Sequence, residues 1–113
     1  MPERDQSILK HMLSYCVDIE EIVQRFGDSY EVFSQDKAYR NACALCILQI
    51  GELAGHLSAD FRAVHSEIPW KAIRAMRNVV AHAYADISFQ TTWDTICTDI
   101  PALRNFCTEQ LSK

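Results

Sequence analysis

The residue types that could do chemistry in this sequence gather between positions 70 and 84. Arg77 is followed five residues later by His82. Metal-free cleavage of RNA needs a group that moves a proton at the 2′-hydroxyl or the leaving oxygen, and a fixed cation for the charge that gathers on phosphorus. An imidazole suits the first task because its charge changes near neutral pH. A guanidinium offers a permanent planar array of donors for the second. We therefore take Arg77 and His82 as the candidate catalytic residues.

Two neighbouring side chains are candidates for a supporting role. Asn78 stands four residues before His82 on the same stripe of a helix, so its amide could hold the imidazole in one tautomer. Tyr84 could stack on a base or donate to a phosphate oxygen.

A helix over residues 69–84 divides into two faces when its residues are spaced by 100°. With Arg77 at 0°, the predicted core face covers about 160° to 320° and consists of Ala72, Ile73, Ala75, Met76, Val79, Val80 and Ala83. The opposite half carries Lys71, Arg74 and Arg77 without a carboxylate, together with Trp70. A basic patch bordered by aromatic rings is typical of a phosphodiester site, so we expect Lys71, Arg74 and Trp70 to bind RNA. A basic helix face with one histidine can also be a solvated surface or a subunit contact.

The positions of Arg77 and His82 raise a geometric problem. They lie about 140° apart around an ideal helix, so one straight helix does not point both side chains at the same atom. Either the helix distorts near Ala81, or a second chain completes the site. A two-fold axis beside this face would bring two such pairs together, and we therefore expect a homodimer.

The composition bounds the class of protein. The 113 residues, 49% of them hydrophobic and only three of them glycine, predict a single folded domain over 1–113. No apolar stretch reaches the roughly 18 residues of a membrane span, and the N-terminal MPERDQ is too charged for a signal peptide. We expect a soluble cytoplasmic protein. The net charge of −4 excludes a general nucleic-acid coat but not a local basic patch.

The cysteines and the remaining histidines show no metal or redox pattern. An odd number of cysteines within apolar helical patterns predicts reduced core thiols, at Cys16, Cys43, Cys46, Cys97 and Cys107. Cys43 and Cys46 form a C-x-x-C, but redox and zinc sites need a helix N-terminus or further ligands. The other histidines (His11, His56 and His65) are interpreted as surface or helix-end residues. With no acidic cluster and no Gly-rich phosphate loop, we expect no metal and no cofactor.

Helical periodicity dominates the chain and predicts an all-α, up-and-down bundle of four to five antiparallel helices. The helices are expected over residues 5–26, 36–57, 69–84, 89–99 and 101–113, with a short link over 28–35 and a polar, irregular stretch over 58–67. Gly27 should end the first helix, and Pro69 and Pro101 should open the third and the fifth. Gly51 and Gly55 lie four residues apart on one side of the second helix, where they either let another helix approach closely or simply loosen the end of the helix.

The segment IPWKAIRAMRNVVAHAY, residues 68–84, closely resembles the signature of HepT-like proteins of the HEPN superfamily. Their hallmark is an arginine, four residues, a histidine, one residue and a tyrosine, which here are Arg77, His82 and Tyr84. QIGELAGHLS (49–58) and DIPAL (99–103) are similar as well, so the likeness covers nearly the whole chain. Leu53 and Ala75 depart from the alanine and glycine that are usual in the family, and neither belongs to the expected chemistry.

The resemblance implies a homodimeric all-α bundle in which the motifs of both chains line a cleft at the interface. It implies a metal-independent endoribonuclease that serves as the toxin of a two-gene toxin–antitoxin system. The antitoxin would be a minimal nucleotidyltransferase of the MNT type, which can silence the toxin by transferring AMP from ATP to Tyr84. Such an adduct would place negative charge and bulk in the basic cleft and block RNA.

Two points stay open at the level of the sequence. Glu52, on the second predicted helix, could orient Arg77 or form a purely structural ion pair. The competing hypothesis for the whole chain is a non-catalytic dimeric module that binds nucleotides or docks a nucleotidyltransferase.

Overall fold

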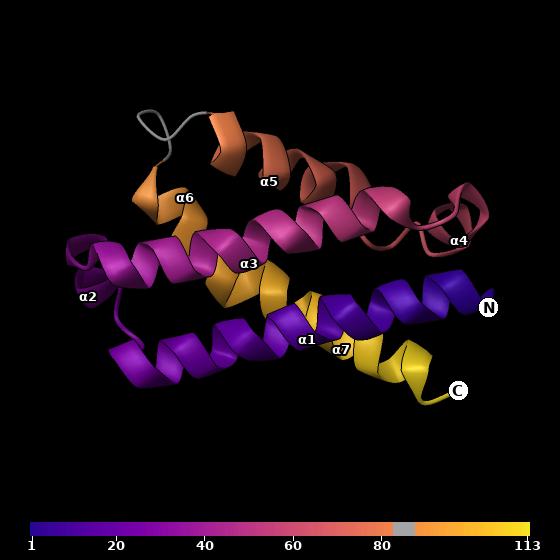
Figure 1. Cartoon of the computed structure of the whole chain (residues 1–113), viewed down its shortest axis with the longest axis horizontal. Helices are drawn as coiled ribbons and strands as arrows, with labels where there is room; N and C mark the ends of the chain where they lie inside the picture. The colour runs from indigo at the N-terminus through magenta and orange to yellow at the C-terminus, as the bar shows by residue number, and fades with distance from the viewer. Residues whose placement is uncertain (83–87) are drawn as a thin grey trace.

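The computed structural model is a helical bundle (Figure 1), and it describes residues 1–82 and 88–113, with the backbone alone for residues 78–82. The long helices are α1 (Glu3–Phe26), α3 (Lys37–His56) and α5 (Trp70–His82). The chain then returns through α6 (Phe89–Asp94), the π-helical turn η1 (Thr95–Asp99) and α7 (Ile100–Leu111). Successive long helices run in opposite directions, and α3 packs against both α5 and α1, while α1 packs against α7. The described residues contain no strand, so the predicted all-α class is confirmed.

The ends of the first two long helices lie within a few residues of the predicted positions, because their caps are local. Gly27 ends α1 with a φ of 119°, and its N–H donates to the Val23 carbonyl over 2.8 Å. Asp36 begins α3, where its carboxylate accepts from the N–H groups of Ala38 (2.9 Å) and Tyr39 (3.2 Å).

The two segments that we expected to link the long helices each contain a short helix, so the prediction of an irregular stretch over 58–67 was wrong and the link over 28–35 holds a helix that we did not predict. Helix α2 covers Tyr30–Gln35 and helix α4 covers Ala59–Val64. Six residues are too few to show a helical period, so their stability comes from packing. Each places one phenylalanine in the core, Phe33 and Phe61. Helix α4 is also tied to α1, because the buried Asp5 carboxylate accepts from the Ser58 N–H (2.8 Å) and hydroxyl (2.7 Å).

The predicted helix break before Pro101 does not occur. Proline has no N–H to donate to the preceding turn, so regular α-helical bonding cannot pass through it unchanged. The chain widens into the π-turn η1 directly before Pro101 and continues as α7, in whose first turn the proline lies. The helical chain therefore continues through Pro101, and only the hydrogen-bonding pattern of the turn before it changes from α to π.

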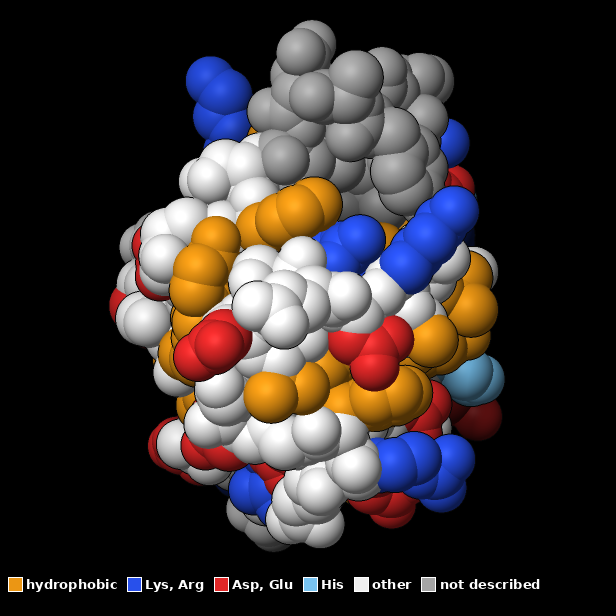
Figure 2. All heavy atoms as spheres, turned by 90° about the vertical axis from the view of Figure 1, so that its left-hand side faces the viewer, with side chains coloured by type: hydrophobic (Ala, Val, Ile, Leu, Met, Phe, Trp, Pro, Cys, Tyr) orange, Lys and Arg blue, Asp and Glu red, His pale blue; other side chains and the backbone are white. Residues whose placement is uncertain are grey.

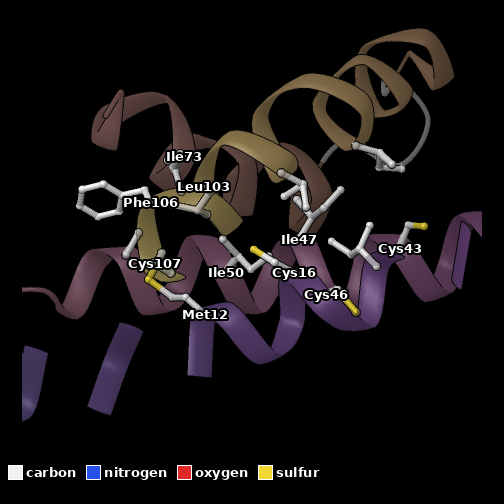
Figure 3. Close-up of a cluster of buried hydrophobic side chains, with 14 of the residues drawn as sticks. Met12, Cys16, Cys43, Cys46, Ile47, Ile50, Ile73, Leu103, Phe106 and Cys107 are labelled. Atoms are coloured by element: carbon white, nitrogen blue, oxygen red, sulfur yellow. The ribbon is translucent and has the colours of Figure 1, made fainter. Parts of the chain in front are cut away.

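The core lies between α1, α3, α5 and α7, as Figure 3 shows. It is built from aliphatic side chains, aromatic rings and thiols, among them Met12, Cys16, Ile47, Ile50, Ile73, Leu103, Phe106 and Cys107. All five cysteines are free, and all but Cys97 are buried. Burial raises the pKa of Cys16, Cys43 and Cys107 to about 12 and that of Cys46 to about 11. The prediction of reduced core thiols is confirmed for these four.

The end of the bundle at which α2 lies carries a mixed surface. Figure 2 shows hydrophobic side chains scattered there among acidic and basic ones. Tyr30, Val32 and Phe89 are each about two-fifths exposed, and the Arg40 guanidinium lies 4.3 Å from the centre of the Phe89 ring. Behind them Tyr39 is fully buried, and its hydroxyl donates to the Gly27 carbonyl over 3.0 Å. A different property concerns membranes. Among the residues that the structure describes, no helix is long and apolar enough to cross a membrane.

Candidate active site

The contact between α3 and α5 is made at a glycine. A Cβ atom built on Gly51 would lie 2.9 Å from the Cβ of Arg77 and 3.0 Å from the carbonyl oxygen of Ile73. One turn further along α3, a Cβ on Gly55 would lie 3.5 Å from Nε of Arg74, which is an ordinary contact. The predicted close approach of another helix is confirmed, and Gly51 is the position that requires it.

The predicted core face of α5 is rotated relative to the observed one. Of that face, Ile73 is buried and Met76 partly buried, but Ala72 and Ala75 are exposed. The side chains of Val79 and Val80, and the whole of Ala83, lie outside the described residues. The contact of Ile73 and Arg77 with α3 sets the rotation of α5. This contact could not be predicted from the order of apolar residues along α5.

Trp70 does not lie on the exposed basic face, which corrects the expectation that it binds RNA. Its side chain is only 7% exposed, and its Nε1–H donates to the carbonyl of His65 over 2.9 Å. Its ring centre lies 6.2 Å from that of Phe61 and 5.8 Å from that of Phe106. As the first residue of α5, Trp70 anchors the helix against α4 and α7, so its ring is not available to a base.

An open groove of about 530 Å³ lies between α3 and α5. Eight residues line it: Gly51, Glu52, Gly55 and His56 from α3, and Lys71, Arg74, Ala75 and Arg77 from α5. Its lining contains three of the eleven Lys and Arg residues of a chain whose net charge is −4, and a single carboxylate. Gly51 and Gly55 contribute no side chain to the groove, and the three cations line it from α5. The groove is therefore a local basic site that suits an anion.

Glu52 lies between a cation and an imidazole. Its Oε2 forms an ion pair with Nε of Arg77, and its Oε1 lies 3.7 Å from Nε2 of His56. The Arg77 and Glu52 side chains are 43% and 48% exposed, so the pair adds little to the free energy of unfolding. The contact is compatible with both roles expected for Glu52, orientation of the guanidinium and a structural ion pair. His56 was missed as a groove residue, although its spacing of four from Glu52 places both on one helix face.

Comparison with known proteins decides the family. The sequence model of the family described as "Ribonuclease HepT-like" matches residues 12–109. The chain belongs to the HepT-like ribonuclease family. It is 35% identical over 105 residues to a candidate RNase of Caldanaerobacter subterraneus subsp. tengcongensis, covering 93% of this chain and 92% of the relative. It is 32% identical over 95 residues to a candidate ribonuclease HepT of Thermococcus cleftensis, covering 80% of this chain and 86% of the relative. No solved structure matched the chain.

Of the three motif residues of this HepT-like chain, the structure describes the side chain of Arg77. Arg77, Arg74 and Lys71 line one groove. His82 is the last residue of α5, which is α-helical from Trp70. Along such a helix the two residues remain about 140° apart. The side chains of Asn78 and His82, and the whole of Tyr84, lie outside the described residues.

Proposed function

We propose that this HepT-like chain is a metal-independent endoribonuclease and the toxin of a HepT/MNT-type toxin–antitoxin system. The observation that supports it best is the position of Arg77 in a basic groove beside Arg74 and Lys71, on the same helix as His82. The chain belongs to a family named for ribonuclease activity, and candidate RNases are among its relatives.

The two catalytic roles follow from the chemistry of the residues. The Arg77 guanidinium stabilises the negative charge that gathers on the phosphorus as the chain is cut. His82 moves the proton at the 2′-hydroxyl or at the leaving oxygen. Asn78 holds the imidazole of His82 in one tautomer, and Lys71 and Arg74 bind the RNA backbone. Together these residues supply proton transfer and charge stabilisation without a metal ion.

A homodimer resolves the separation of Arg77 and His82. A second copy placed across the exposed side of α5 would bring its own motif beside the groove. The exposed Ala72 and Ala75 favour this arrangement because small side chains allow a second helix to come close. Light scattering should give twice the 12.9 kDa mass of one chain. A mass of 12.9 kDa at working concentration would contradict the shared site.

The antitoxin is proposed to be a nucleotidyltransferase that transfers AMP from ATP to Tyr84, so that the tyrosine oxygen bonds to the α-phosphorus, pyrophosphate leaves and the phenol proton is released. The hydroxyl of this tyrosine would gain a negatively charged phosphodiester two residues from His82, where it would repel RNA from the cations of α5. The purified chain, incubated with an MNT-type enzyme and ATP, should gain the mass of AMP, and Tyr84→Phe should not. Modification of Tyr84→Phe to the same extent would place the acceptor elsewhere.

The ribonuclease function is tested by incubating the purified chain with tRNA and mRNA in the presence of EDTA. Wild type should cleave, and His82→Ala and Arg77→Ala should not. His11→Ala is the matched control, because His11 is an exposed histidine on α1 and not part of the groove. Equal cleavage by wild type and His82→Ala would identify a contaminating nuclease and remove the catalytic assignment.

A further inference from the structure

The groove continues from Arg77 toward the beginning of α5, and His56 lines it there together with Lys71 and Arg74. We propose that His56, Lys71 and Arg74 form a second phosphate subsite, which holds the RNA phosphate next to the one at Arg77. The proposal rests on the ribonuclease function above and adds to it a residue of α3, His56, and an extended substrate.

The first argument is the arrangement of the cations. Lys71, Arg74 and Arg77 follow one another at three-residue steps, about 4.5 Å of helix rise each. They therefore form a row along the groove and not a single cluster. A ligand with one charge would use one end of this row. A polymer with a charge on every repeat, such as an RNA backbone, can use its whole length.

The second argument is the floor of the groove at Gly55. Nε of Arg74 lies 3.5 Å from the position that a Cβ of Gly55 would occupy, so the Arg74 side chain extends over α3. His56 follows Gly55 directly, and its side chain is 56% exposed. An imidazole from α3 and a guanidinium from α5 thus line the same part of the groove from opposite sides. Both can donate to phosphate oxygens.

The third argument is the charge of the two parts of the groove. Glu52, the single carboxylate of the lining, pairs with Arg77 and offsets the charge of that cation. No second carboxylate lines the groove near Lys71 and Arg74. Glu52 also lies 3.7 Å from Nε2 of His56, so the strongest positive potential of the groove is expected at Lys71 and Arg74, away from the reacting phosphate. That distribution suits a subsite that binds the backbone while Arg77 serves the chemistry.

The test uses a short RNA that the protein binds, made with its natural phosphates and with a neutral methylphosphonate at each of two adjacent linkages in turn. Binding is measured by fluorescence anisotropy in the non-cleaving His82→Ala protein. One neutral linkage should weaken binding about tenfold, as expected for one lost charge-assisted contact. Adding His56→Ala, or Arg74→Gln, to this protein should weaken binding of natural RNA and abolish the difference between natural and neutral RNA.

His11→Ala in the same background is the control and should keep the tenfold difference. The proposal is overturned if neither neutral linkage weakens binding, or if the losses from His56→Ala and from the neutral linkage multiply as independent effects do. Cleavage of natural RNA by the wild type separates the two hypotheses. If binding behaves as expected but the wild type does not cleave, the subsite stands and the ribonuclease function fails.

Discussion

Gly51 of α3 lies in direct contact with the backbone of Arg77 in α5, where a Cβ on the glycine would come within 2.9 Å of the arginine Cβ and 3.1 Å of its N. The residue proposed to stabilise charge on the phosphorus is thus positioned by a residue without a side chain. The contact also sets the rotation of α5 and, with it, which of its residues face the groove.

Replacing Gly51 by alanine should separate α3 from α5. The atoms that the new methyl group meets belong to the backbone and Cβ of α5, and these cannot move without moving the helix. We expect a loss of about 1–3 kcal/mol in the free energy of unfolding, as for other overpacked sites. We also expect a loss of RNA cleavage larger than the loss of folded protein. Urea unfolding and cleavage assays check both.

Gly55→Ala is the matched control, because its methyl group would meet only the Arg74 side chain at 3.5 Å. Alanine is favoured over glycine within a helix by up to about 1 kcal/mol, so this variant should be as stable as wild type or more stable. Equal effects of the two substitutions would contradict the specific contact at Gly51.

The sequence predicts the long helices well because their signals are local. The apolar repeat of α1, the glycine at its end and the aspartate before α3 each act through residues within one or two turns. The short helices α2 and α4 cannot be found in this way. Their stability depends on Phe33 and Phe61 reaching the core and on Asp5, which lies 53 residues from its partner Ser58.

In the candidate site, too, the features that depend on local spacing could be predicted and those that depend on long-range contacts could not. Lys71, Arg74 and Arg77 could be grouped from their spacing, and the structure places all three along one groove. The burial of Trp70 could not be predicted, because it depends on Phe61, His65 and Phe106 from other parts of the chain. The catalytic pairing of Arg77 with His82 remains a prediction.

Glu52→Gln should strengthen RNA binding. Glutamine keeps an oxygen that accepts from Nε of Arg77, but it removes the negative charge that repels phosphate. The dissociation constant should fall by a few-fold at low salt and by less at high salt, because the effect is electrostatic. Stability should change by less than about 1 kcal/mol.

Fluorescence anisotropy at two salt concentrations measures this effect of Glu52→Gln. Glu21→Gln removes one exposed negative charge from α1, and it should leave binding nearly unchanged. Weaker RNA binding by a folded Glu52→Gln protein would show that the carboxylate itself supports the ligand, and would contradict the repulsion argument.

Trp70→Phe should affect stability and not RNA binding. The phenyl ring cannot donate to the His65 carbonyl, and it fills less of the space beside Phe61 and Phe106. We expect a loss of about 1–2 kcal/mol in the free energy of unfolding. The affinity of the folded protein for RNA should match wild type. Lys71→Ala should show the reverse behaviour, with weaker RNA binding at unchanged stability. A large loss of affinity in Trp70→Phe without loss of stability would restore the base-stacking role.

The stability of the fold should fall in alkaline solution because of its buried thiols. Unfolded cysteines ionise near pH 8.5, whereas burial raises the pKa of Cys16 to about 12 and that of Cys46 to about 11. Below about pH 8.5 both states keep the proton, so the thiols do not make stability depend on pH. Above it, the unfolded state loses protons that the folded state retains, and the free energy of unfolding decreases. Each such thiol contributes a slope of about 1.4 kcal/mol per pH unit, which ends near its folded pKa.

Urea unfolding between pH 7 and pH 10 measures this slope. Cys16→Ala removes one buried thiol, so its slope above pH 8.5 should be shallower than that of wild type, whatever its stability at pH 7. Cys97→Ser removes the exposed cysteine, whose pKa is raised to a smaller extent by partial burial and by Asp28 and Asp94, so it should reduce the slope less than Cys16→Ala does. The comparison of slopes isolates ionisation from the cavity that Cys16→Ala creates, because a cavity lowers stability equally at every pH. A stability that stays constant from pH 8.5 to pH 10 would mean that the thiols reach solvent in the folded protein.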